Sequence, residues 1–106
     1  MRLFLYGTLL DPAVLTRHAG RPLRMTPADL PGWQRVRLRG TPYPTLVPGP
    51  GRTRGAVVRV DPRALRGLRR YEGPRYRLLP VAPLCAGRRM PAHAWIGDAP
   101  TRRPWP

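Results

Sequence analysis

Runs of apolar residues along this chain, some continuous and some alternating, predict about five strands. Arg2–Tyr6 is apolar after its first residue, which is typical of a buried strand, and Gly7 ends it. Trp33–Leu38 alternates in side-chain character, as a half-exposed strand does. Gly55–Val60 has the strongest strand pattern in the middle of the chain because it is rich in valine. Two further strands are expected at Tyr76–Val81 and Ala92–Ile96.

Two short helices are predicted from start signals that occur twice. Asp11-Pro12 combines a good N-cap residue with a proline at the first helical position, and Asp61-Pro62 repeats the pair. The first helix is expected from Pro12 to about His18, with Gly20 as its stop. The second is expected over Pro62–Tyr71, with Gly73 as its stop.

The remaining segments give weaker patterns. Met25–Leu30 is ambiguous between element types, and Gly40–Arg54 is expected to be mostly turns, with Tyr43–Val47 as one short extended piece. Pro100–Pro106 has the composition of a loose tail. The sixteen prolines and eleven glycines of the chain also favour short elements joined by stiff turns.

The order strand, helix, strand, strand, helix, strand, strand predicts an α+β fold. It fits neither a strict strand–helix alternation nor an all-strand protein, so we expect a small mixed β-barrel of about five or six strands with short flanking helices. A length of 106 residues supports one domain with a single modest core. We therefore expect one domain over residues 1–106, with residues 98–106 as a loose C-terminal tail.

The charge is strongly positive, at a formal +15 from 20 basic and 5 acidic residues. Such a balance invites a nucleic-acid interpretation. The arginines are scattered, however, and lysine is absent, which is the pattern that a GC-rich coding bias also produces. Nucleic acid is therefore an unlikely partner, although the charge should attract small anions.

Other residue types restrict the chemistry. There is no serine nucleophile, and one cysteine with two histidines makes no zinc site, so we expect no metal. A Cys85–His93 pair stays open as an alternative nucleophile. No apolar run approaches the roughly 20 residues that span a bilayer, and we expect a cytoplasmic protein with no membrane partner.

Glu72 is the only glutamate of the chain and the best candidate for a catalytic group. Leu65 and Leu68 lie seven and four residues before it, so the three side chains share one face of the predicted helix. Burial on that face would raise the pKa of the carboxyl and make it a base near neutral pH. The alternative is a surface carboxylate paired with a nearby arginine, Arg69, Arg70 or Arg75, which would lower that pKa.

A second candidate is the turn after the first strand, Tyr6-Gly7-Thr8-Leu9. A junction from strand through glycine to helix leaves backbone N–H groups without partners, and these suit a carboxylate or an oxyanion. Such junctions are also common as purely structural turns. The Thr8 hydroxyl is either a binding group or only part of the turn, and Tyr43 and Tyr76 are either core or site residues.

Together these motifs resemble the gamma-glutamylcyclotransferase-like superfamily, in its branch of avirulence-induced-gene-like (AIG2-like) proteins and gamma-glutamylamine cyclotransferases. The resemblance is carried by Tyr6-Gly7-Thr8-Leu9, by Gly40 with Tyr43-Pro44, by Gly55, and by Tyr71-Glu72-Gly73 followed by Tyr76. It spans about residues 1 to 97. The closing segment of the family is only faintly echoed, by Gly97-Asp98 and Trp105.

The resemblance implies an enzyme that needs no cofactor. The α-amine of a γ-glutamyl group would attack its own γ-carbonyl, giving 5-oxoproline and releasing the attached amine. It implies that Tyr6, Gly7, Thr8 and Leu9 bind the glutamyl moiety and that Glu72 is the general acid and base. The alternative is a non-catalytic protein of the same fold that binds an anionic metabolite or, less plausibly, nucleic acid. The leaving amine and the oligomeric state are not indicated by the sequence.

Overall fold

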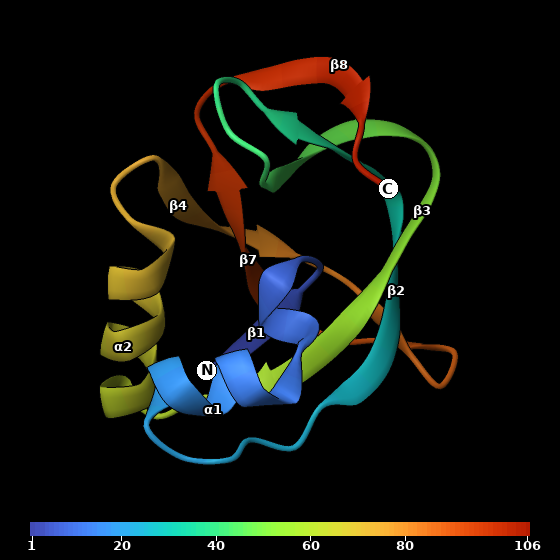
Figure 1. Ribbon diagram of the computed structural model, residues 1–106. Coiled ribbons are helices and arrows are strands. Elements are labelled where there is room, and N and C mark those ends of the chain that lie inside the picture. The colour runs from blue at the N-terminus through green and yellow to red at the C-terminus, as the bar shows by residue number, and fades with distance from the viewer.

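The computed structural model describes residues 1–106 and has one curled sheet with two helices packed on its outer face (Figure 1). The expected α+β class is confirmed. The helical elements are a 3-10 turn, Thr8–Leu10, and the helices α1 (Pro12–Ala19) and α2 (Pro62–Glu72). The strands are β1 (Arg2–Leu5), β2 (Thr26–Leu38), β3 (Pro44–Arg59), β4 (Tyr76–Val81), β5 (Leu84–Cys85), β6 (Arg88–Arg89), β7 (Ala92–Gly97) and β8 (Pro100–Pro104).

The sheet is mixed and has the strand order β4-β7-β1-β3-β2-β5-β6, with β8 added beside β2. β1 runs antiparallel to β3 and parallel to β7. The sheet curls so far that β7 returns to the beginning of β3, where the Gly97 N–H donates to Thr45 Oγ1 at 2.7 Å. The result is the barrel-like shape expected from the sequence.

β1 is buried on both faces, which explains its continuous apolar run. Leu3 and Leu5 point outward and pack under the helices with Leu68. Phe4 and Tyr6 point into the curl of the sheet. The strand therefore lies between two hydrophobic clusters, and the end of β1 is held in place from both sides.

Both helices begin as the sequence predicts. Asp11 Oδ1 accepts a hydrogen bond from the Ala13 N–H at 2.9 Å, and Asp61 Oδ1 accepts one from the Ala64 N–H at 2.8 Å. Each helix has its proline in the first turn. These caps satisfy N–H groups that a helix cannot pair internally.

The expectation of short elements in the middle of the chain is wrong. Met25–Leu30 leads into and forms part of β2, and most of the Gly40–Arg54 segment lies in β3, a strand of 16 residues. β1 pairs only with Ala56–Arg59, the last residues of β3. The preceding part of β3 forms its long ladder of backbone pairs with β2. Prolines are tolerated there because a strand with one unpaired side does not need every N–H.

The expectation of a loose C-terminal tail is also wrong. β8 pairs with β2, with Pro104 opposite Val36 and Pro100 opposite Leu38. Trp105 then donates from its indole N–H to the Pro42 carbonyl at 2.9 Å. The free edge of β2 provides the backbone partners that composition could not reveal.

Neither helix has the length and apolar character that crossing a membrane requires.

Candidate active site

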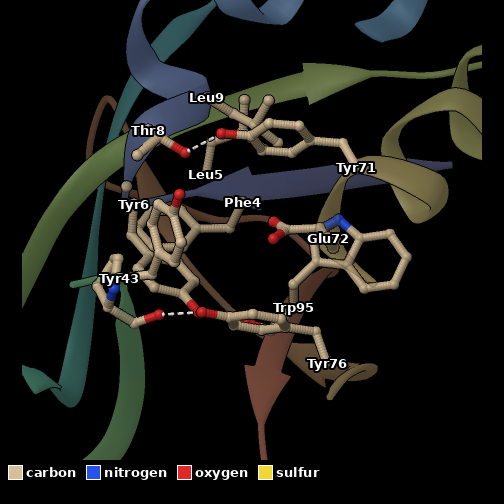
Figure 2. Close-up of a pocket in the computed structure, with 12 residues that line it drawn as sticks. Phe4, Leu5, Tyr6, Thr8, Leu9, Tyr43, Tyr71, Glu72, Tyr76 and Trp95 are labelled. Atoms are coloured by element: carbon tan, nitrogen blue, oxygen red, sulfur yellow. Dashed lines mark hydrogen bonds between the residues drawn. The ribbon is translucent and has the colours of Figure 1, made fainter. Parts of the chain in front are cut away.

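A cavity of about 140 Å³ lies at the end of β1, where the chain leaves the sheet. All five predicted site residues line it: Tyr6, Gly7, Thr8, Leu9 and Glu72. Figure 2 shows the Glu72 carboxyl pointing between Tyr71 above and Tyr76 below, toward Tyr6, the residue that follows β1. The structure thus brings together two motifs that are more than sixty residues apart.

Glu72 is placed by the end of α2. Leu68 on the same face is fully buried against the sheet, while the arginines of the opposite face are exposed. Gly73 follows with φ 83° and ψ 179°, a conformation that essentially only glycine adopts. The chain therefore turns sharply after Glu72, and β4 starts at Tyr76 beside the same cavity.

The environment of Glu72 raises its pKa from 4.5 to about 7, and the cause is desolvation by burial. Its place in the last turn of a helix acts in the same direction, because the negative end of the helix dipole disfavours a carboxylate. At neutral pH the group is therefore close to half protonated. This is the property that a residue needs to accept a proton in one step and return it in the next.

The alternative of an arginine pair is not realised. The Arg75 guanidinium binds Asp98 at 3.0 Å and the Arg39 carbonyl at 2.9 Å. The Arg69 guanidinium lies 5.3 Å from the centre of the Trp95 ring. No ion pair involves Glu72, which is why nothing offsets the cost of burying its charge.

The turn opposite Glu72 has donors available. The N–H groups of Thr8 and Leu9 open the 3-10 turn and have no partner within it, and the Gly7 N–H donates to no backbone carbonyl. A Cβ at Gly7 would lie 2.8 Å from Pro44 Cγ, so the turn and the start of β3 are in close contact. This close approach closes one side of the cavity and requires glycine.

Three tyrosine hydroxyls tie the cavity wall together. Tyr71 and Thr8 share a hydrogen bond of 2.6 Å between α2 and the turn, Tyr76 donates to the Pro44 carbonyl at 2.7 Å, and Tyr6 donates to the Trp95 carbonyl. Burial raises the pKa of Tyr76 to about 12 and that of Tyr6 well above its usual range, with the Glu72 charge adding to both. These phenols stay protonated, and their donors are bound to main-chain oxygens instead of Glu72.

Several wall residues were missed or left undecided by the sequence. Tyr43 and Tyr76, which the sequence left open between core and site, line the cavity, and so do Tyr71 and Trp95, which were not predicted as site residues. The signal that could have identified Tyr71 is its position next to Glu72. Trp95 comes from β7, and only the curl of the sheet brings it here.

The alternative nucleophile is elsewhere. Cys85 is buried in the cluster inside the curled sheet, and neither it nor His93 lines the cavity. No three or more histidine, cysteine, aspartate or glutamate side chains gather where they would hold a metal ion.

Comparison with known proteins finds a family model that matches nearly the whole chain. The family model described as gamma-glutamyl cyclotransferase, AIG2-like, matches residues 3–105. AIG2-like protein A of Arabidopsis thaliana is 38% identical over 80 residues, which are 74% of this chain and 48% of that protein. The chain thus spans about half the length of this curated relative.

Solved structures share the architecture. A solution structure of an Arabidopsis thaliana protein has a TM-score of 0.78 and 31% identity, covering 91% of this chain and 67% of the other. A structure titled gamma-glutamyl cyclotransferase has a TM-score of 0.80 over 94% of this chain and 68% of the other. At 16% identity, the second similarity supports the fold alone.

Proposed function

We propose, since this chain belongs to the gamma-glutamyl cyclotransferase, AIG2-like family, that it cyclises a γ-glutamyl group to 5-oxoproline and releases the attached amine. The observation that supports this most is the Glu72 carboxyl. It lies in a cavity with a pKa near 7, opposite a turn with available N–H donors. No cofactor is needed for such a reaction, because one group that moves protons and one that holds the substrate are sufficient.

The chemistry is an acyl transfer within the substrate. The α-amino nitrogen forms a bond to the γ-carbonyl carbon, and the bond from that carbon to the leaving nitrogen breaks. An α-ammonium group must lose two protons to become the ring amide N–H, and the leaving amide N–H must gain two to depart as an ammonium. Glu72 is proposed to carry these protons between the two nitrogens, as base and then as acid.

The turn has the complementary task in this proposal. N–H groups of Gly7, Thr8 and Leu9 bind either the α-carboxylate of the glutamyl moiety or the oxyanion formed during attack. The hydrogen bond between Thr8 and Tyr71 links the turn to α2, so the donors and the base keep a constant separation. This is the kind of positioning on which a cyclisation depends.

The cavity size supports a small substrate group. The cavity volume is about 140 Å³. This is below the range of about 300–1,000 Å³ that is typical for drug-sized ligands. We therefore propose that the glutamyl moiety enters the cavity and that the amine to be released extends past the exposed Tyr43 at the rim.

The test is direct detection of the product. The protein is incubated with γ-glutamyl amines, γ-glutamyl amino acids and glutathione in separate reactions, and 5-oxoproline is measured by mass spectrometry. We expect product from at least one of these classes. Binding of a γ-glutamyl compound without any 5-oxoproline would favour the alternative, a non-catalytic protein of the same fold.

The proposal also predicts a pH dependence. The base form of Glu72 is required, and its pKa is about 7, so kcat/KM should rise about tenfold per pH unit below pH 7 and level off above it. The measurement is a profile of kcat/KM from pH 5 to 8.5 with the best γ-glutamyl substrate. A profile that is flat between pH 5 and 7 would contradict a base with this pKa.

A further inference from the structure

A second cavity, of about 420 Å³, lies at the other end of the barrel and shares no residue with the first. It opens at the beginning of β1, whereas the Glu72 cavity lies at the end of that strand. The segment between α1 and β2 forms one wall and runs along the lower edge of the molecule in Figure 1. Nothing in the proposed cyclisation uses this cavity.

Four arginines surround the second cavity, and we call this region the basic mouth: Arg2, Arg21, Arg24 and Arg59. Only one of them has a carboxylate partner, since Arg21 binds Asp61 at 3.2 Å. The other three make no ion pair and no hydrogen bond through their side chains. The basic mouth is therefore a concave surface on which positive charge is concentrated.

Two of these arginines lie directly opposite each other. Arg2 on β1 and Arg59 on β3 are register partners in the antiparallel pair, so their side chains share one face of the sheet. Val57, two residues before Arg59, is on the same face and belongs to the cluster inside the curl. Like charges directly opposite on a sheet destabilise it. A bound anion would remove that repulsion.

We propose that the basic mouth binds a small molecule that carries a diphosphate or longer phosphate chain. Guanidinium groups bind phosphate oxygens in pairs, with short charge-assisted hydrogen bonds. Three guanidinium groups without a carboxylate partner, from two strands and a loop, are more than a single phosphate group requires. They suit two adjacent phosphate groups. Val57, Leu23 and Met90 add an apolar surface for the organic part of the ligand.

The lining argues for a small molecule over a nucleic-acid strand. Proteins that bind single strands combine a basic track with aromatic side chains on which bases stack. The basic mouth has no aromatic residue, and its volume lies within the range of small-molecule pockets. The ligand class is thus a compact polyphosphate.

The test measures binding of inorganic pyrophosphate and of ATP to the full chain by calorimetry at fixed salt. We expect both to bind, and Arg2→Gln or Arg59→Gln to weaken binding of pyrophosphate about tenfold, the loss of one charge-assisted pair. Arg102→Gln, an exposed arginine of β8 at the far end of β2, is the matched control and should change the affinity less than twofold. Glu72→Gln should leave it unchanged.

A second measurement separates binding from folding. Without ligand and at low salt, Arg59→Gln should melt at the same temperature as the parent or higher, because a like-charge pair has been removed. Equal weakening by Arg102→Gln, or no weakening by Arg2→Gln and Arg59→Gln, would overturn the proposal. So would a single-stranded oligonucleotide that displaces pyrophosphate and binds more tightly than ATP. None of these outcomes affects the assay for 5-oxoproline.

Discussion

Replacing Glu72 with glutamine is expected to abolish 5-oxoproline formation while the protein still binds its γ-glutamyl substrate. The amide keeps the shape of the side chain but cannot accept the proton of the attacking ammonium or protonate the leaving amine. A positioned acid or base is worth about 10²–10⁴-fold in rate, and one residue serves both steps here, so we expect a loss of at least about 10³-fold in kcat. Single-turnover product analysis and ligand titration measure the two quantities separately.

A matched control for this variant is Asp29→Asn. This variant also removes a carboxylate, which in the parent binds Arg52 at 3.4 Å. Asp29 does not line the cavity. Its turnover should stay within about twofold of the parent. Turnover of the Glu72→Gln variant at the parent rate would reject Glu72 as the base.

The same variant gives a check on the buried carboxyl itself. The folded-state pKa of about 7 lies above the ordinary value of 4.5, so the folded state binds this proton more tightly. The stability that this provides is complete below pH 4.5 and is lost as the pH rises through 7. At pH 8 the glutamine variant, which has no charge to bury, should be more stable than the parent by on the order of 3 kcal/mol, and the difference should shrink toward pH 4.5. Urea unfolding at both pH values measures this, and it also shows that the variant is folded.

Replacing Gly67 with alanine is expected to destabilise the protein strongly, although the same substitution stabilises an isolated helix. In an exposed helix this change would stabilise by up to about 1 kcal/mol. Here a Cβ at Gly67 would lie 2.0 Å from the His18 carbonyl oxygen, because α1 and α2 touch backbone to backbone. The helices must separate, and overpacking of this kind costs about 1–3 kcal/mol or more. We expect a net loss of about 2 kcal/mol and a melting temperature about 8–16 °C lower.

The neighbouring exposed position supplies the control for this prediction. Arg66→Ala lies on the solvent face of α2 and should change the melting temperature by no more than a few degrees. Because α2 also carries Glu72, a displaced helix should reduce turnover along with stability. A Gly67→Ala protein that melts at a higher temperature than the parent would show that the close contact is not maintained.

Much of the local structure could be predicted from the sequence because its causes are local. The Asp-Pro pairs determine both helix starts through one hydrogen bond each. The spacing of Leu65, Leu68 and Glu72 determines that the carboxyl shares the face that packs on the sheet. Arg2–Tyr6 needs only its own apolar run to be identified as a buried strand. The candidate residues Tyr6–Leu9 and Glu72 came from such local motifs and from family resemblance.

Only the tertiary structure decided the long hairpin, the terminal strand and the chemical state of the site. Proline and glycine indicate a turn unless a partner strand offers backbone groups, and β2 offers them to both β3 and β8. Trp95 and Tyr76 reach the cavity because the sheet curls. The pKa of Glu72 depends on which charges lie nearby, and no arginine forms an ion pair with it: Arg75 binds Asp98, and Arg69 lies over the Trp95 ring. Each of these properties arises from contacts between distant residues, which local patterns do not encode.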